Sequence, residues 1–168
     1  MKILALNGSR RKNGNTAALV DAVLGAAAAD GAATEALFLG DYNIGACTGC
    51  EGCSNSWECV IKDDFQPLVA RMDAADGVVF ASPTYWYSVT SDMKRLIDRC
   101  YSLIRFPVSR KEWISKYAGS GRAAVVVAVC EQETEDMMGN TLQLLNDFAG
   151  DIGLPVAATV RGLQHFAA

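Results

Sequence analysis

The chain has 168 residues, 51% of them apolar and 20% charged, and it carries a formal net charge of −4 at pH 7. This length is enough for one substantial hydrophobic core, and the composition is ordinary for a globular protein. The acidic balance argues against nucleic acid as a partner, and no apolar run is long enough to cross a bilayer. We therefore expect a single domain over residues 1–168, located in the cytoplasm, that binds neither nucleic acid nor a membrane.

Strand and helix patterns alternate along the chain. Apolar runs predict five strands, at residues 2–6, 34–39, 77–81, 123–129 and 154–160. Apolar residues at helical spacing predict four helices, at residues 17–30, 63–72, 93–104 and 138–148. This alternation is typical of an α/β fold with a parallel sheet and helices on both faces. Ligands of such folds bind where the carboxyl ends of the strands meet.

The segment Gly8–Thr16 joins the first predicted strand to the first predicted helix. Backbone N–H groups and the positive end of the helix dipole meet at such a junction and favour an anion. The residues suited to hold a phosphate there are Ser9, Arg11, Gly14, Asn15 and Thr16. The segment has neither the Gly-Lys-Ser/Thr of a P-loop nor the three glycines of a dinucleotide turn. It predicts a site for a terminal monophosphate, with an ordinary capped turn as the alternative.

Three aromatic residues in a row follow the third predicted strand. They belong to a loop whose candidate ligand-binding residues are Ser82, Pro83, Thr84, Tyr85 and Trp86, followed by Tyr87. Consecutive aromatics on a loop offer flat faces for stacking, and backbone amides beside Pro83 can hydrogen-bond the edge of a heterocycle. A loop packed by its own aromatics is the alternative. A flat ring here and a monophosphate at the first turn together describe a mononucleotide such as FMN.

Four of the six cysteines lie close together, at Cys47, Cys50, Cys53 and Cys59. A chain without a secretion signal is not expected to use them as a disulfide framework, so they indicate metal or redox chemistry. The remaining two, Cys100 and Cys130, lie in apolar runs and are predicted to be core residues.

Four motifs in the same order resemble one known family. They are Gly8 to Thr16, Cys47-x-x-Cys50-x-x-Cys53 with Asp63-Asp64 behind it, Ser82 to Trp86, and Lys94-x-x-x-Asp98-Arg99. Over about residues 2–160 the chain resembles the NAD(P)H-dependent FMN reductases, which are flavodoxin-like proteins, and within them the iron–sulfur flavoproteins. The resemblance implies a flavodoxin-like three-layer α/β/α sandwich whose five-stranded parallel sheet has the order 2-1-3-4-5.

The same resemblance implies how FMN is bound. Its phosphate would be held by Ser9, Arg11, Asn15 and Thr16, and its isoalloxazine would lie against residues 83–86. Members of the family commonly pair, so a homodimer or homotetramer is expected. Two departures leave the substrate open: Tyr87 replaces a small residue, and the loop at residues 130–133 lacks the usual glycines.

The cysteine spacing matches the compact motif of the iron–sulfur flavoproteins. Two x2 spacings let three thiolates converge on one face of a cluster, and a [4Fe-4S] cluster takes four thiolates, here Cys47, Cys50, Cys53 and Cys59. A four-thiolate zinc site and free thiols are the alternatives.

We therefore predict an FMN-dependent oxidoreductase that takes electrons from NAD(P)H and reduces flavin, a quinone or a protein acceptor. The flavin supplies the chemistry, so no catalytic acid or base is assigned. The alternative is a relay in which FMN and a [4Fe-4S] cluster pass electrons between partner proteins without direct NAD(P)H turnover.

Other polar residues receive structural predictions. Asp92, Lys94 and Arg95 are expected on a solvated helix face, and Asp98 and Arg99 are expected to pair or to support a dimer contact. The basic segment at residues 105–122 is expected to be a surface excursion or a lid, with contact to NADPH phosphates as the alternative. His165 is expected to be solvated.

Overall fold

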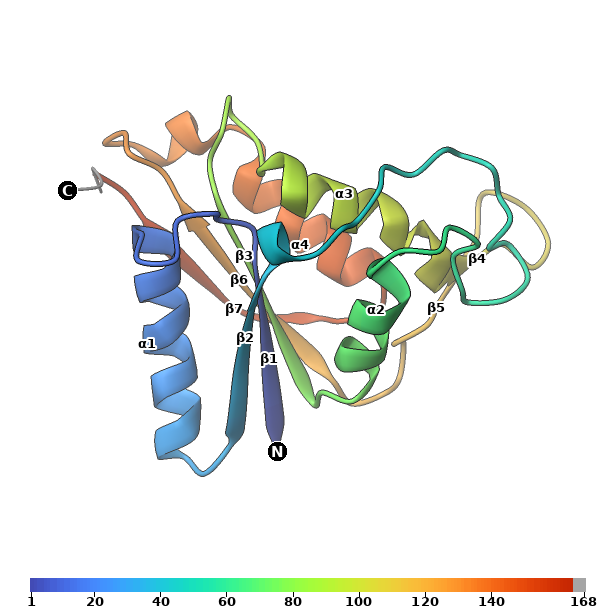
Figure 1. Cartoon of the computed structure of the whole chain (residues 1–168), viewed down its shortest axis with the longest axis horizontal. Helices are drawn as coiled ribbons and strands as arrows, with labels where there is room; N and C mark the ends of the chain where they lie inside the picture. The colour runs from blue at the N-terminus through green and yellow to red at the C-terminus, as the bar shows by residue number, and fades with distance from the viewer. Residues whose placement is uncertain (165–168) are drawn as a thin grey trace.

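The computed structural model describes residues 1–164, so His165 lies outside the described residues. The strands of the main sheet are β1 (Lys2–Asn7), β2 (Ala33–Phe38), β3 (Gly77–Pro83), β6 (Ala123–Val129) and β7 (Val156–Gly162). They lie in the order β2-β1-β3-β6-β7, and every neighbouring pair is parallel (Figure 1). These are the five predicted strands in chain order, so the expected sheet order 2-1-3-4-5 is confirmed.

The α-helices that flank the sheet are α1 (Asn15–Ala29), α2 (Phe65–Asp73), α3 (Ser91–Arg99) and α4 (Thr141–Asp151). Alternate residues of a strand point to opposite faces. The face that carries Ala5 and Val127 packs against Leu24 of α1. The opposite face, which carries Leu6 and Phe80, packs against α2, α3 and α4. Within residues 1–164, no helix is both long and apolar enough to span a membrane.

The structure differs from the predicted helices at two ends. Helix α3 ends at Arg99 and continues as a 3₁₀ turn, η2 (Cys100–Leu103), before the strand β4 (Ile104–Arg105). This strand pairs in antiparallel fashion with β5 (Ile114–Ser115). Strands of two residues are too short to produce a periodic pattern, which is why this hairpin was not predicted. Near α4, Met138 belongs to a separate 3₁₀ turn, η3 (Glu135–Met138), because Gly139 has a φ of +54° and interrupts the helix.

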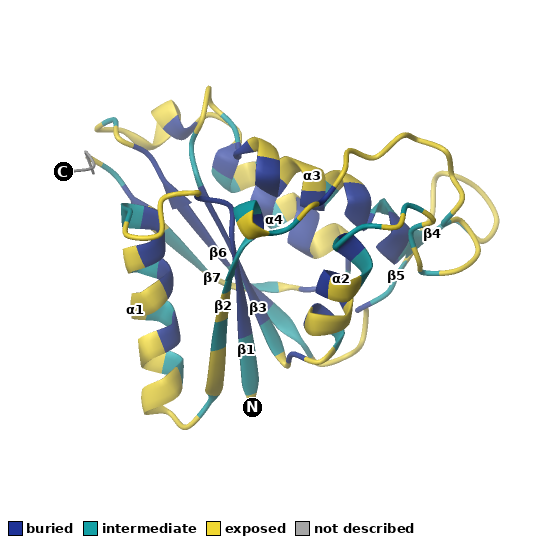
Figure 2. Cartoon of the chain, viewed as in Figure 1, coloured by how far each residue is buried: buried dark blue, intermediate teal, exposed yellow. Residues whose placement is uncertain are grey.

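The loop that carries the cysteines leaves the sheet after the 3₁₀ turn η1 (Leu39–Asp41). We call residues 42–64 the cysteine loop. It extends away from the sheet beside the β4–β5 hairpin, and most of it is exposed (Figure 2). The side chain of Arg110 forms an ion pair with Glu51 at 2.5 Å, and the guanidinium of Arg105 lies 4.0 Å from the centre of the Trp57 ring. The basic segment is thus a surface excursion that covers one side of the cysteine loop.

Candidate functional site

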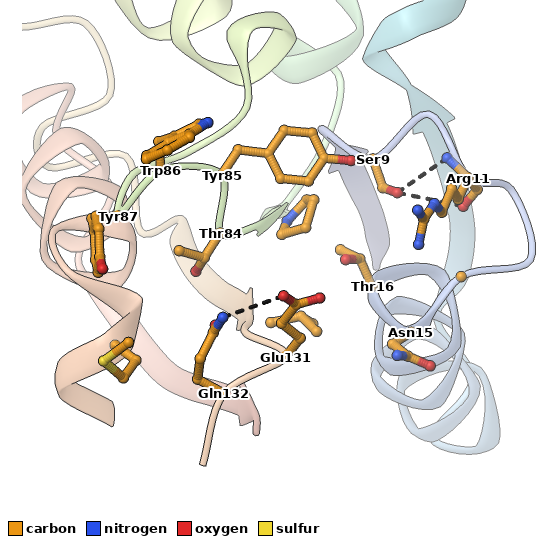
Figure 3. Close-up of a pocket in the computed structure, with 14 residues that line it drawn as sticks. Ser9, Arg11, Asn15, Thr16, Thr84, Tyr85, Trp86, Tyr87, Glu131 and Gln132 are labelled. Atoms are coloured by element: carbon orange, nitrogen blue, oxygen red, sulfur yellow. Dashed lines mark hydrogen bonds between the residues drawn. The ribbon is translucent and has the colours of Figure 1, made fainter. Parts of the chain in front are cut away.

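A cavity of about 580 Å³ opens at the carboxyl ends of β1, β3 and β6 (Figure 3). It lies among the β1–α1 loop (residues 8–14), the β3–α3 loop (residues 84–90) and the β6–α4 loop (residues 130–140). Its lining residues are Ser9, Arg11, Gly14, Asn15, Thr16, Pro83, Thr84, Tyr85, Trp86, Tyr87, Val129, Glu131, Gln132 and Met137. The structure therefore brings together every predicted cofactor residue except Ser82.

The β1–α1 loop is held in shape by its own short hydrogen bonds. The backbone N–H of Ser9 donates to Asn7 Oδ1 at 2.9 Å, and that of Arg11 donates to Ser9 Oγ at 3.1 Å. Gly14 is the N-cap of α1 and has no side chain with which to cap it, so the first turn of the helix faces the cavity uncapped. The free N–H groups and the positive end of the helix dipole at such a turn favour an anion.

Arg11 is the cation of this loop that is available to a ligand. Arg10 is engaged by both carboxylate oxygens of Asp92, at 2.6 and 2.9 Å, and Lys12 is paired with Asp41 at 2.7 Å. Within residues 1–164, the Arg11 guanidinium forms no ion pair. Arg11, the cation that the sequence analysis assigned to the phosphate, lines the cavity, whereas Lys12 does not.

The N-terminus of α3 supports the β1–α1 loop from behind. Thr90 caps this helix and donates its Oγ1 proton to the carbonyl of Gly8 at 2.8 Å. A Cβ on residue 8 would lie 2.8 Å from Thr90 Oγ1, so the close approach of the two segments requires glycine at this position. A threonine ahead of an apolar helical pattern signals an N-cap, but no sequence pattern reveals its bond to Gly8.

The prediction that Asp92 lies on a solvated face was wrong. Its side chain is only 6% exposed, and its hydrogen bonds with Arg10 hold the pKa of the carboxyl below its ordinary value. The prediction that Arg99 pairs with Asp98 was also wrong, because Asp98 pairs with Lys94 and Arg99 pairs with Asp63. Both errors concern charged residues that pair with distant parts of the chain.

The β3–α3 loop presents its three aromatic residues on a tight turn. Tyr85 and Ser88 exchange backbone hydrogen bonds of 2.8 and 3.2 Å, and Trp86 and Tyr87 between them have φ values of +50° and +61°. Two consecutive residues with positive φ form a type I′ turn, which bulky side chains adopt at a cost. The turn leaves Trp86 93% exposed and Tyr85 and Tyr87 about half exposed at the rim of the cavity.

Two polar side chains of β3 and its loop have different roles. Ser82 is fully buried, where its Oγ donates to the carbonyl of Pro83 and accepts the N–H of Thr90, and it does not line the cavity. Its role is therefore to position the loop. Thr84 does line the cavity, and its buried Oγ1 has no hydrogen-bond partner within residues 1–164. The Thr84 hydroxyl is therefore free to hydrogen-bond a molecule in the cavity.

The β6–α4 loop contributes residues that the sequence did not assign to the site. The thiol of Cys130 donates to Gln132 Oε1 at 2.8 Å, and the Gln132 amide donates to Glu131 Oε1 at 3.3 Å. Figure 3 shows Glu131 and Gln132 between the aromatic loop and the first turn of α1. The signal available in the sequence was their position directly after a buried strand at the ligand-binding edge of the sheet.

The comparisons with known proteins agree with this geometry. A family model described as NADPH-dependent FMN reductase matches residues 1–156. The chain belongs to this family. Among curated relatives, an iron-sulfur flavoprotein of Methanocaldococcus jannaschii is 36% identical over 123 residues, covering 73% of this chain and 64% of its own length. One from Methanosarcina thermophila is 32% identical over 124 residues, covering 73% of this chain and 65% of its own length. The chain thus spans less than two thirds of the length of these relatives.

Comparison with solved structures confirms the flavodoxin-like fold of this chain. An azoreductase from Bacillus anthracis superposes with a TM-score of 0.75 at 12% identity, over 98% of this chain and 88% of that one. An FMN-dependent NADH-azoreductase of the same species, solved in complex with FMN, superposes with a TM-score of 0.67 at 13% identity and the same coverage. At such identities the likeness concerns the fold alone.

The cysteine loop of this FMN reductase family member contributes no residue to the cavity. The loop starts after β2 and the 3₁₀ turn η1, at the same edge of the sheet as the cavity, but it then runs to the other end of the molecule (Figure 1). Neither does any residue between 105 and 122 line the cavity. The basic segment is therefore not a lid over this cavity in the structure.

The four cysteines of the loop influence one another. Cys47 and Cys50 are exposed, whereas Cys53 and Cys59 are half-buried. The pKa of Cys53 is raised, mainly by burial and further by the nearby thiols of Cys59, Cys47 and Cys50. The pKa of Cys50 is lowered by hydrogen bonds from the backbone of Gly52 and the side chain of Thr48. Within residues 1–164, no three side chains converge as they would on a single metal ion.

Cys100 and Cys130 are buried, as the sequence predicted.

Proposed function

We propose that this protein is an FMN-dependent oxidoreductase that takes electrons from NAD(P)H and passes them to flavin, a quinone or a protein acceptor. The observation that carries the proposal is the cavity itself. It combines an uncapped helix N-terminus with a cation at one end and an aromatic turn at the other. Membership of the NADPH-dependent FMN reductase family supports the same conclusion.

The α1 end of the cavity fits a phosphate. A terminal phosphate carries nearly two negative charges and three acceptor oxygens. Arg11 would supply a charge-assisted hydrogen bond, while Ser9 and Thr16 would supply hydroxyl groups that are almost fully buried. The first-turn N–H groups of α1 would complete the set of donors.

The aromatic end of the cavity fits a flat heterocycle. Tyr85, Trp86 and Tyr87 can cover the faces of a ring, and the unpartnered Thr84 hydroxyl can hydrogen-bond its edge. Glu131 lies between the two ends and would accept from hydroxyl or ring N–H groups of the ligand. Bound FMN would supply the redox chemistry, while these residues bind and orient it and exclude water from one of its faces.

We also infer that two copies of the chain associate over the β3–α3 loop. The indole of Trp86 is 93% exposed, and Met137 beside the cavity is 37% exposed. A second copy laid over these side chains would bury them and close the cavity, as a homodimer or within a homotetramer. Sedimentation equilibrium of the protein and of Trp86→Ser tests this, and a wild-type monomer at micromolar concentration would refute it.

A relay that uses an iron–sulfur cluster is a second candidate function. Its support is the thiols of Cys47, Cys50 and Cys59 near that of Cys53, and the names of the relatives, which are iron-sulfur flavoproteins. The donor set fits, because a cubane cluster attaches its four thiolates to four separate iron atoms and does not require them to converge on one ion. Cys47, Cys50, Cys53 and Cys59 would hold it. Since they do not line the cavity, electrons would reach a flavin through a contact between two chains.

One preparation tests both functions. The protein is purified without oxygen, its absorption spectrum is recorded, iron and flavin are assayed, and NADH and NADPH are then added with a quinone. Bound flavin with rapid turnover supports the reductase. About four irons per chain without turnover supports the relay. Absence of flavin, even after incubation with FMN, would refute both.

A further inference from the structure

Arg99 is a buried charged residue whose guanidinium forms five hydrogen bonds. It is the last residue of α3, its side chain is 0% exposed, and its guanidinium lies 4.7 Å from the centre of the Phe65 ring. A guanidinium has five N–H donors in a fixed plane. The five hydrogen bonds of the Arg99 guanidinium all end on the cysteine loop.

Two of these bonds join Arg99 to Asp63. Nη1 donates to Oδ2 at 2.6 Å and Nη2 donates to Oδ1 at 3.0 Å. Asp63 in turn accepts the backbone N–H groups of Gly45 at 2.8 Å and Phe65 at 3.0 Å. These bonds hold the pKa of Asp63 at about 2, with the bond from Arg99 as the largest cause. The pair therefore stays ionised at every physiological pH.

The remaining bonds of Arg99 fix the two ends of the cysteine loop. Nη1 donates to the carbonyl of Gly45 at 3.0 Å, two residues before Cys47, and Nη2 donates to that of Ile61 at 3.4 Å. Nε donates to Cys59 Sγ at 3.2 Å. One of the four predicted thiolate ligands is thus held by a buried cation that also closes the loop around the other three.

We propose that Arg99 is the positioning residue of the four-cysteine site: it holds the Cys59 sulfur in place and, through the Nε–H bond, raises the reduction potential of an iron–sulfur centre bound there. A hydrogen bond from a cation to a ligating sulfur stabilises the reduced state, which carries one more negative charge. The second part of this inference, the raised reduction potential, rests on the relay function proposed above. The first part, the positioning of the Cys59 sulfur, concerns the loop alone and applies to the metal-free protein.

The test uses Arg99→Lys, which keeps the positive charge and the apolar part of the side chain but loses the planar guanidinium with its five N–H donors. Lys94→Arg is the control, because Lys94 is an exposed residue of the same helix whose partner is Asp98. In the metal-free, reduced protein, the alkylation rate of each cysteine by iodoacetamide is measured by mass spectrometry. We expect Cys59 to react about tenfold faster in Arg99→Lys, because the loop loses hydrogen bonds that keep this thiol half-buried; a tenfold change corresponds to about 1.4 kcal/mol. The rates at Cys100 and Cys130 should not change.

The second measurement is the midpoint potential after anaerobic reconstitution with ferrous iron and sulfide. We expect Arg99→Lys to bind iron and to show a midpoint lower by about 60 mV, which is a tenfold change in the one-electron equilibrium constant. The control should match the wild type in both measurements. Equal Cys59 alkylation in Arg99→Lys and wild type overturns the positioning role. An unchanged midpoint, or a wild-type protein that binds no iron, overturns the tuning role, and the second result also removes the relay function.

Discussion

The two ends of the molecule are built in opposite ways. The β1–α1 loop spans only residues 8–14 and is fixed by hydrogen bonds to β3, to the cap of α3 and within itself. The cysteine loop spans residues 42–64, contains neither helix nor strand, and is closed mainly by one buried ion pair. A short loop between a strand and a helix inherits its shape from the sheet, whereas a long loop needs a side chain to organise it. The first site should therefore be robust and the second should depend on single residues.

The largest expected effect is the loss of Arg99. Arg99→Met leaves the Asp63 carboxylate buried without its partner, and we expect the free energy of unfolding to fall by about 3–5 kcal/mol. Urea denaturation followed by circular dichroism measures it. Lys94→Met removes an exposed ion pair of the same helix and should cost less than about 1 kcal/mol. Equal effects of the two variants would show that Arg99 does not organise the cysteine loop.

At the other end, Arg11 is expected to affect ligand binding more than stability. Arg11→Ala removes a charge-assisted hydrogen bond worth about 1.5–3 kcal/mol, so the Kd for FMN should rise roughly 10- to 100-fold. Fluorescence titration of FMN measures the affinity. Lys12→Ala is the matched control, since Lys12 is paired with Asp41, and it should change the Kd less than about threefold. A larger effect at Lys12 than at Arg11 would reverse the assignment of the phosphate cation.

Acid should weaken the cysteine end first. The pKa of Asp63 is about 2 in the folded protein, below its ordinary value of 3.8, so the carboxylate stabilises the fold at pH values above about 4. This contribution, about 2 kcal/mol, is lost as the pH falls from about 4 to 2. The difference in unfolding free energy between wild type and Asp63→Asn should shrink over that interval. A difference independent of pH between 5 and 2 would contradict the role of the ionised pair.

The smallest expected effect distinguishes a ligand-binding hydroxyl from an incidental one. Thr84 and Thr141 both have a buried Oγ1 without a partner within residues 1–164, but only Thr84 lines the cavity. Both threonine-to-valine variants should be at least as stable as wild type, because an unsatisfied polar atom is removed. Only Thr84→Val should weaken FMN binding, by about 1 kcal/mol or roughly fivefold. Similar FMN affinities for the two variants would remove Thr84 from the site.

Local patterns in the sequence determined much of this protein. Short, mainly apolar runs identified the five strands, helical spacing identified the helices, and the alternation of the two implied a parallel sheet. The residues from Ser9 to Thr16 and from Pro83 to Trp86 could be assigned to one site because parallel strands end at a common edge. The same short motifs identified the FMN reductase family, to which the chain belongs.

Only the tertiary structure decided which charged residues are buried and with whom they pair. Arg10 and Asp92 are 82 positions apart, and Arg99 and Asp63 are 36 apart, so no local pattern records either pair. No local pattern records the hydrogen bond from the Thr90 hydroxyl to the Gly8 carbonyl either, or the separation of the cysteine loop from the cavity. Backbone periodicity is a property of neighbours in sequence, whereas the burial of a charge depends on which distant segments meet around it.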